Sequence, residues 1–253
     1  MDNDDLPVGQ ILSRREALKL LGVTSAAVLA ACVPGASEVL EATSAPTQAT
    51  SATTTGALPA CVVRPEVTEG PYYVDEDLGR SDIRSDPSTG EVKEGALLRL
   101  TFNVSQVSNG SCTPLEGAKV EIWHCDADGV YSDVSDPGFD TTGQKFLRGY
   151  QVTDANGQAT FITIYPGWYS GRTVHIHFKV HHDTSDQSAV FTSQLFFDDT
   201  LTDQVFIGEP YASKGQRNTL NSNDNIYNEQ LLLVAAQADE GYAATFDIGL
   251  QMA

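Results

Sequence analysis

Apolar and polar residues alternate in short segments along the chain from residue 96 onward. The clearest segment covers residues 174–180, VHIHFKV, whose period of two is typical of a β-strand. Residues two apart in a strand point to the same face, so His175 and His177 share one face and the apolar side chains share the other. The pattern predicts a half-buried strand with two imidazoles on its polar face.

Further segments show the same alternation, and clusters of Gly, Asn and Asp separate them. These predicted strands cover residues 96–104, 118–123, 150–153, 159–165, 190–197 and 244–252. Long helical periodicity is nearly absent, and one short helix is predicted at residues 231–238. Strands at this spacing predict an all-β fold, an antiparallel β-sandwich with long loops. One such loop, PGWYSG at residues 166–171, can place Tyr169 over the histidine face.

The first 31 residues have the composition of a bacterial export signal. A twin arginine at positions 14–15 precedes an apolar run over residues 20–31, which is too short to span a membrane comfortably. Ala17 stands where twin-arginine signals usually carry Phe or another bulky apolar residue, so the choice between the Tat and Sec pathways stays open. The run ends in LAAC, which resembles the lipobox of bacterial lipoproteins and makes Cys32 the expected lipidation site. We therefore expect an exported protein, at the bacterial cell surface or on the periplasmic side, that contacts the membrane only through its lipid anchor.

Composition separates the remaining chain into a tether and one domain. Residues 32–58 are rich in Ala, Ser and Thr and bury too little apolar surface to fold, so we expect a disordered tether. Residues 59–253 have a length suited to a single domain. The chain has a formal net charge of −19, of which the export signal contributes only −1. So acidic a surface argues against nucleic acid or anionic lipid as a partner.

The cysteines are consistent with an oxidising compartment. Besides Cys32 the chain contains Cys61, Cys112 and Cys125. Two of these three are expected to pair, and the sequence leaves open which two. There is no C-x-x-C motif, so neither a zinc ribbon nor a thioredoxin-like site is expected.

Five motifs occur along the domain in the order found in a known enzyme family. They are TEGPYY (68–73), RSDI (80–83), EIWHCDADGVYS (121–132), YPGWYSGRTVHIHF (165–178) and SQLFF (193–197). Over residues 61–224 the chain thereby resembles the intradiol ring-cleavage dioxygenases, the family of protocatechuate 3,4-dioxygenase and catechol 1,2-dioxygenase. Members of this family are non-haem Fe(III) enzymes that open catechol rings with O₂.

The resemblance implies one ferric ion per chain, held by Tyr131, Tyr169, His175 and His177. Phenolate oxygens are hard anionic donors that favour ferric over ferrous iron. The metal must keep both tyrosines deprotonated, because a free phenol has a pKa of about 10. The resemblance also makes Tyr169 a catalytic residue, which leaves the metal and accepts a proton from the substrate.

The resemblance further implies a substrate site and a reaction. Arg172 and Gln194 match catalytic residues beside the substrate, where Arg172 would stabilise developing negative charge. The residues implied to bind the substrate are Tyr72, Tyr73, Trp168 and Arg172. The implied reaction cuts a catechol-type ring between its two hydroxylated carbons and gives a cis,cis-muconate-type diacid. Which catechol is cleaved stays open, and so does the oligomeric state, a homo-oligomer included.

Two alternatives belong to other classes of protein. His-x-His on a β-sandwich also suits copper or zinc, but such a site needs another His or Cys, and only His124, His181 and His182 remain. The last two follow the predicted strand into what is expected to be a solvated polar loop. The other alternative is an exported binding module without catalytic activity, against which the joint presence of the implied ligands and catalytic residues argues.

Overall fold

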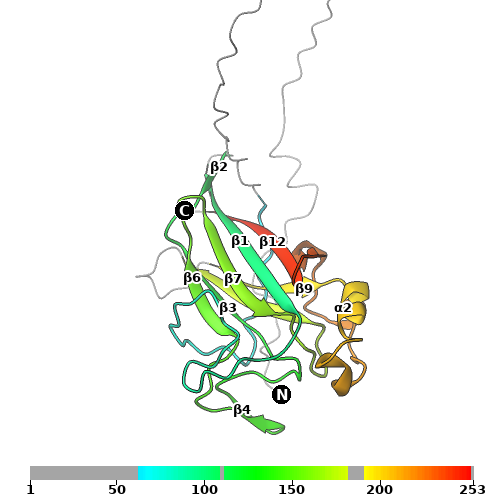
Figure 1. Cartoon of the computed structure of the whole chain (residues 1–253). Coiled ribbons are helices and arrows are strands. Elements are labelled where there is room, and N and C mark those ends of the chain that lie inside the picture. The colour runs from blue at the N-terminus through cyan, green and yellow to red at the C-terminus, as the bar shows by residue number, and fades with distance from the viewer. Residues whose placement is uncertain (1–61, 109–110, 182–190, 252–253) are drawn as a thin grey trace, which may run out of the picture. The chain divides into compact units, whose positions relative to one another are not determined.

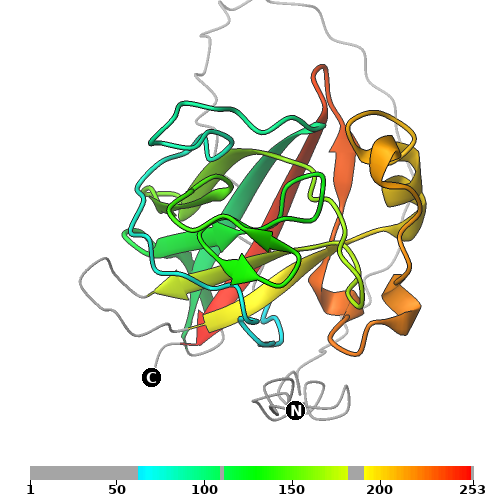
Figure 2. The same cartoon turned by 90° about the horizontal axis from the view of Figure 1, so that it is seen from below.

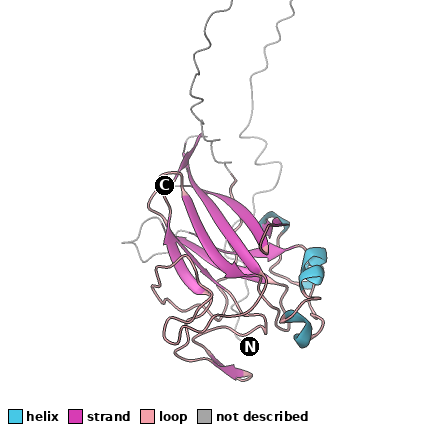
Figure 3. Ribbon diagram, viewed as in Figure 1, coloured by secondary structure: helices cyan, strands magenta, loops and turns pink. Residues whose placement is uncertain are grey.

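Two β-sheets that share one apolar core form the domain in this computed structural model (Figures 1 and 3). The structure describes residues 62–108, 111–181 and 191–251. The predicted export signal, the tether, Cys32 and Cys61 all lie outside the described residues. Within them the all-β prediction is confirmed, because strands make up most of the regular structure.

The first sheet is organised around its longest strand, β1. Its strands are β1 (Leu97–Ser108), β2 (Ser111–Pro114), β7 (Gln158–Ile164), β11 (Ala235–Gln237) and β12 (Tyr242–Gln251). β2 and β7 pair with β1 in the antiparallel sense, whereas β12 lies parallel to β1 along the opposite edge. This sheet is therefore mixed. The parallel pair is possible because a long connection separates β1 from β12, and the chain returns from the second sheet through β11 before it forms β12.

The second sheet carries the predicted histidine strand at its centre. Its order is β10 (Leu232–Leu233), β9 (Phe191–Phe197), β8 (His175–His181), β3 (Lys119–Trp123) and β6 (Arg148–Val152). A short hairpin of β4 (Ser135–Asp136) and β5 (Phe139–Asp140) lies in the connection from β3 to β6. Figure 1 shows this hairpin and neighbouring loops gathered beyond one end of the strands, and Figure 2 gives the view onto that end.

Aromatic side chains from both sheets meet in the core. The ring of Phe178 on β8 lies 5.2 Å from that of Phe102 on β1 and 5.7 Å from that of Phe246 on β12. All three side chains are almost fully buried. Burial of large apolar rings between the sheets is the main favourable contribution to such a sandwich.

The prediction that β8 is half-buried is wrong, because every residue of the strand is buried. The segment before β1 covers the polar face: the N–H of Val67 donates to the carbonyl of Thr192 (3.2 Å), and Glu69 pairs with Lys179 (2.5 Å). The alternation along the strand is real, but it separates an apolar interior from a polar layer under loops rather than from water. The histidines therefore lie in a buried environment.

The helical elements differ from the prediction. α2 (Asp199–Val205) follows β9, and the carboxylate of Asp198 caps it by accepting the N–H of Leu201. Three 3₁₀ turns follow, η1 (Tyr211–Lys214), η2 (Asn221–Asn223) and η3 (Glu229–Leu231). Among the described residues no helix is long and apolar enough to cross a membrane.

The helix predicted at residues 231–238 is wrong, because this segment ends η3 and then forms β10 and β11. Leu232 lies opposite Phe196 of β9, and Ala235 lies opposite Ala244 of β12. Pairing with these two strands overrides the local preference for a helix.

Candidate metal centre and active site

The four predicted metal ligands meet at one point above β8. Nε2 of His175 lies 3.1 Å from Nε2 of His177, 3.1 Å from Oη of Tyr169 and 3.4 Å from Oη of Tyr131. The two histidines come from the strand itself, and the tyrosines come from the loops after β3 and before β8. Two oxygen and two nitrogen donors thus face one another in a buried space.

The surroundings of each histidine orient its ring. Nδ1 of His175 lies 2.6 Å from the carbonyl oxygen of Thr173, so this nitrogen carries the proton and donates it, and the lone pair of Nε2 points into the cluster. The ring of His177 stacks on the indole of Trp123, with centroids 5.0 Å apart and planes 8° apart. Gly70 packs against the same imidazole, where an added Cβ would lie 3.0 Å from Cε1. Both rings are therefore held with Nε2 inward.

The two tyrosine loops contact each other through their backbones. The N–H of Gly167 donates to the carbonyl of Asp126 (3.1 Å). A Cβ at Gly167 would lie 2.3 Å from the carbonyl oxygen of Ala127 and 2.4 Å from that of Asp126, so only glycine fits there. This contact fixes the loop of Tyr169 against the loop of Tyr131.

Burial keeps all four groups neutral in the absence of a cation. It raises the pKa of Tyr131 and of Tyr169 well above the ordinary value of 10. Burial, followed by the charge of Arg172, lowers the pKa of His175 to about 3. The pKa of His177 is also far below its ordinary value, because of burial and then of the neighbouring His175. A metal ion would reverse this balance for the phenols, since its charge compensates the phenolates.

The donor set fits a single ferric ion better than the alternative metals. Two neutral imidazoles and two ionisable phenols supply both nitrogen donors and hard anionic oxygens. Within the described residues no group of three or more His, Cys, Asp or Glu could hold a metal ion. The third histidine or cysteine that a copper or zinc site would need is therefore not found in this part of the chain.

Two other histidines are buried but play no part in the cluster. His124 lies 2.8 Å from the carbonyl oxygen of Cys125 and 2.6 Å from Oγ1 of Thr163, and burial lowers its pKa to about 4. His181 was expected in a solvated loop, which is wrong, because it ends β8 and is only 5% exposed. This end of the strand is therefore buried as well.

Arg172 and Gln194 lie together beside the cluster. Nη2 of Arg172 donates to Oε1 of Gln194 (2.6 Å), and Nε2 of Gln194 donates to the carbonyl of Thr68 (2.8 Å). Gln194 lies on β9 directly opposite His177. The structure thus brings both predicted catalytic residues to the histidine pair.

Asp224 is a site residue that the sequence did not reveal. Its Oδ2 accepts hydrogen bonds from Nε of Arg172 and from the N–H of Thr173, both 2.8 Å long. Burial alone would raise the pKa of Asp224, but the charge of Arg172 and the N–H donors of Thr173 and Ile226 outweigh it and hold the pKa below the usual range. No motif marks this position, which is separated from Arg172 by 52 residues.

Among the predicted substrate residues, Tyr72 packs directly against two of the clustered ligands. Its ring stacks on that of Tyr131, with centroids 4.6 Å apart, and meets Tyr169 edge-on at 6.1 Å. Its hydroxyl donates to Oδ2 of Asp136 on β4 (2.9 Å). Burial, with a further contribution from Asp136, raises the pKa of Tyr72 to about 12. Tyr72 therefore covers Tyr131 as a neutral phenol.

Tyr73 and Trp168 face other groups. Tyr73 packs over Trp123, with ring centroids 4.9 Å apart, and its hydroxyl donates to Glu121 (3.3 Å), so it supports the wall behind His177. The indole N–H of Trp168 donates to the carbonyl of Gly215 (3.2 Å). Direct contact of either side chain with a substrate stays a prediction.

Arg148 is a second residue that the sequence did not reveal. It is buried, and its Nη2 donates to the carbonyl oxygens of Ser132 (2.6 Å) and Tyr72 (2.8 Å). It thereby connects the residue after Tyr131 to the segment that covers Tyr131. Arg148 is the first residue of β6, and polar residues are common at the ends of strands. The sequence pattern therefore does not indicate that Arg148 connects these two segments.

The structure reduces the number of possible disulfide pairings. Cys125 is free and buried, and its thiol donates to the carbonyl of Gly167 at 3.6 Å. Burial raises the pKa of this thiol to about 12. Cys112 is disulfide-bonded. The pairing therefore includes Cys112 and leaves out Cys125.

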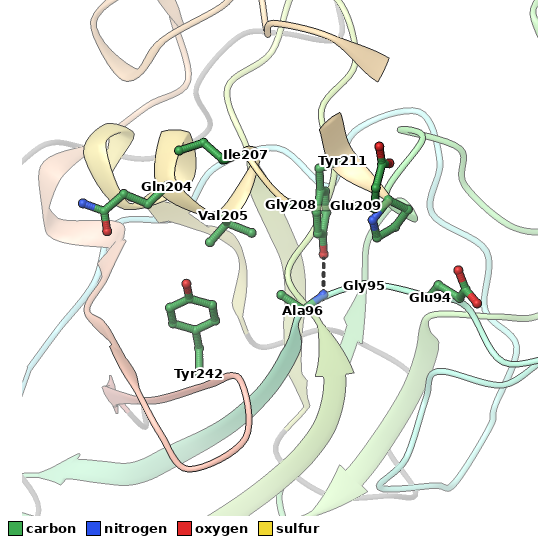
Figure 4. A pocket seen from close by; sticks show the side chains of 11 residues that line it. Glu94, Gly95, Ala96, Gln204, Val205, Ile207, Gly208, Glu209, Tyr211 and Tyr242 are labelled. Carbon is green, nitrogen blue, oxygen red and sulfur yellow. Dashed lines mark hydrogen bonds between the residues drawn. The ribbon is translucent and has the colours of Figure 1, made fainter. Parts of the chain in front are cut away.

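A separate cavity of about 480 Å³ lies near η1 and the start of β1 (Figure 4). Its walls include the side chains of Tyr211, Tyr242, Val205 and Ile207. The hydroxyl of Tyr211 accepts the N–H of Ala96 at 3.0 Å, the dashed line in Figure 4. None of the four clustered ligands lines this cavity, so it is distinct from the candidate metal centre.

Comparison with known proteins agrees with this geometry. Residues 68–252 match the protein-family model Dioxygenase_C, described as dioxygenase. The beta chain of protocatechuate 3,4-dioxygenase from Burkholderia cepacia is 33% identical over 155 residues, which are 57% of this chain and 65% of that protein. Catechol 1,2-dioxygenase from Acinetobacter baylyi is 37% identical over 113 residues, 42% of this chain and 32% of that enzyme. The chain thus spans between about a third and two thirds of these relatives.

Solved structures show the same architecture. An intradiol ring-cleavage dioxygenase from Tetranychus urticae superposes with a TM-score of 0.66 at 31% identity, over 76% of this chain and 95% of that one. The dioxygenase domain of a carbohydrate-binding fusion protein from Streptomyces sp. SirexAA-E gives a TM-score of 0.54 at 29% identity, over 76% of this chain and 100% of that one. The chain belongs to the intradiol ring-cleavage dioxygenase family.

Proposed function

We propose that this protein is a non-haem Fe(III) dioxygenase that opens a catechol-type ring between its two hydroxylated carbons with O₂ and forms a cis,cis-muconate-type diacid. The observation that carries the proposal is the meeting of two phenol oxygens and two imidazole nitrogens, with Nε2 of His175 within 3.1–3.4 Å of the other three donors. The family relationship supports the same reaction class.

The four ligands would hold one iron per chain. When bound, Fe(III) supplies the electron-accepting character that exposes a coordinated catechol to O₂. The ligands are not equivalent: Tyr131 is 1% exposed and lies under Tyr72, whereas Tyr169 is half-buried at the loop surface. Tyr169 is therefore the ligand that can move, and its Oη, deprotonated in the metal-bound state, would take a proton from a substrate hydroxyl.

Arg172 and Gln194 supply the polar side of the substrate site. The guanidinium is held beside the cluster before any substrate arrives, through its contact with Gln194. A cation fixed in this way stabilises negative charge that develops on the ring oxygens without having to reorganise during the reaction. Tyr72 stacks on the ring of Tyr131, and the side chain of Tyr131 is buried.

The test is metal analysis combined with product identification. The purified protein should contain about one iron per chain, show a red tyrosinate-to-iron charge-transfer band, and convert catechol to cis,cis-muconate with uptake of O₂. Tyr131→Phe should bleach or shift the band because it removes an anionic ligand. Tyr73→Phe is the matched control, since its hydroxyl bonds Glu121 rather than the cluster, and it should keep iron and colour.

Two results would contradict the proposal. A colourless protein with stoichiometric zinc or copper would exclude the ferric site. A yellow semialdehyde as the main product would mean that the enzyme cuts the bond between one hydroxylated carbon and its non-hydroxylated neighbour.

We infer from the sequence that the protein is exported and anchored through Cys32. The twin arginine, the short apolar run and the LAAC motif support this location. Cys32→Ser should release the protein from the membrane fraction or leave it unprocessed, with catalytic activity intact. Labelled palmitate on the Cys32→Ser protein would contradict the assignment.

A further inference from the structure

A single buried carboxylate connects the predicted catalytic arginine to a predicted metal ligand. The side chain of Asp224 is 1% exposed, and its Oδ2 accepts both Nε–H of Arg172 and the N–H of Thr173, each at 2.8 Å. The carbonyl of Thr173 in turn accepts Nδ1–H of His175 at 2.6 Å. The path from guanidinium to imidazole therefore consists of one carboxylate and one residue of backbone.

The carboxylate and the residue that it binds are themselves anchored. The other oxygen of Asp224 accepts the N–H of Ile226 (2.8 Å). The hydroxyl of Thr173 donates to Oδ1 of Asn221 (2.7 Å), and the amide of Asn221 donates to the carbonyl of Phe197 at the end of β9 (2.7 Å). Asp224 thus belongs to a rigid turn that is fastened to the second sheet.

These contacts restrict Arg172 to one orientation. A free arginine side chain has large rotamer entropy, but here Nε is held by Asp224 and Nη2 by Gln194. Nη1 makes no hydrogen bond to a described residue, so it remains available for a ligand. Arg172 is also only partly buried, with a side-chain exposure of 16%, which allows this edge to meet a bound molecule.

A contribution to stability alone does not account for the pair well. A buried ion pair gains little over apolar side chains of similar size, because removing both charges from water costs about as much as their attraction returns. What such a pair adds is a fixed orientation of the groups that it binds. Here it fixes the guanidinium of Arg172 and, through Thr173, the imidazole of His175, which belong to the same site.

We propose that Asp224 is the positioning residue of this active site, which orients Arg172 toward the substrate and, through Thr173, keeps Nε2 of His175 directed at the metal. This inference rests on the proposed function. Asp224 itself touches neither substrate nor metal, and its effect on turnover passes through Arg172.

The main test is a double-mutant cycle on the iron-loaded protein with Asp224→Asn, Arg172→Ala and the double variant. Asparagine keeps an oxygen for the N–H of Thr173 but loses the charge that holds Arg172. We expect Asp224→Asn to lower kcat by about 10- to 100-fold with a much smaller change in KM, as for other residues that orient a catalytic group. Because the loss passes through Arg172, the double variant should be no worse than Arg172→Ala within about twofold.

The matched control is Asp203→Asn, which removes a carboxylate that also pairs with an arginine, Arg217, but on α2. It should leave kcat and KM unchanged. If Asp224→Asn does not fold, Arg172→Lys replaces it in the comparison. An ammonium group cannot bond Asp224 and Gln194 in a fork, so Arg172→Lys should lose as much kcat as Arg172→Ala.

A readout without turnover checks the contact directly. In the iron-free protein the Nε–H of Arg172 should exchange slowly with solvent by NMR in the wild type and rapidly in Asp224→Asn. Wild-type turnover per iron in Asp224→Asn, or losses that multiply in the double variant, would each overturn the inference while the proposed function stands. A wild-type protein that neither binds iron nor cleaves catechol would overturn the proposed function and this inference with it.

Discussion

On its inner face strand β8 presents Ile176, Phe178 and Val180 to the core, whereas its outer face presents His175 and His177 to a layer of loops. Both faces are buried, but by different means. The apolar side chains pack against aromatic rings of the first sheet, where contact area matters and direction matters little. The imidazoles are held by stacking and by hydrogen bonds, which act only at defined angles.

The difference shows where stability and chemistry lie in this sandwich. The inner face can exchange one apolar side chain for another of similar volume at modest cost. The outer face leaves polar atoms without partners in the described protein, such as Nδ1 of His177, and such atoms are costly unless a function requires them. One face of β8 thus stabilises the fold, and the other face carries the side chains of the site.

The largest effect is expected on the inner face. Phe178→Ala should lower the free energy of unfolding by about 3–5 kcal/mol, because it leaves a cavity between the two sheets. Denaturant unfolding of the iron-free protein measures this loss. The folded fraction should still bind one iron per chain, and a folded variant unable to bind iron would show that the two faces are not separable.

The converse substitution tests the outer face. His177→Leu keeps a similar volume but removes one ligand, so the affinity for iron should fall by roughly 100-fold or more. This loss is larger than the loss expected when a residue that only orients a ligand is removed. Competition with a chelator measures the affinity. The free energy of unfolding without iron should change by less than about 1 kcal/mol, since Nδ1 already lacks a partner. A loss of stability comparable to that of Phe178→Ala would contradict this separation.

A smaller effect is expected where the outer loops meet. Gly167→Ala would place a Cβ 2.3 Å from the carbonyl oxygen of Ala127, so the Tyr169 loop must shift. Overpacking of this kind costs about 1–3 kcal/mol, and the charge-transfer band should weaken or move. Gly138→Ala is the control, because its Cβ would meet nothing closer than 3.6 Å. Identical spectra for the two variants would mean that the loop contact does not position Tyr169.

The smallest expected effect is a dependence of stability on pH in the loop layer. Burial would raise the pKa of Asp86, but hydrogen bonds from Ser88, Thr89 and the N–H of Lys145 outweigh it and lower the pKa from 3.8 to about 2. A depressed pKa in the folded state means that Asp86 stabilises the fold above about pH 4 and that this contribution is lost as the pH falls toward 2. Asp86→Asn should flatten the fall in stability over this window, as measured by thermal unfolding. If the stability of the wild type and of Asp86→Asn falls in parallel over this pH range, Asp86 is not the source of the dependence.

Local pattern was sufficient for most strands and failed where a partner element decides the structure. The alternation around His175 and Phe178 is a property of a few consecutive residues, and the strand forms where it was expected. Residues 231–238 carry enough apolar residues for a helix, yet Leu232 pairs with β9 instead. The polar residues around His181 predict a solvated loop, yet His181 ends β8 and is buried.

The sequence by itself determined which side chains could do chemistry: His175 and His177 must share a face because a strand has a period of two, and Tyr131 and Tyr169 stand in loops. Only the tertiary structure decided that the two loops meet over that face and that Asp224, 52 residues beyond Arg172, lies behind it. The physical reason is that a strand's periodicity is set by local backbone geometry. Contacts between distant segments depend instead on how the sheets and loops pack as a whole.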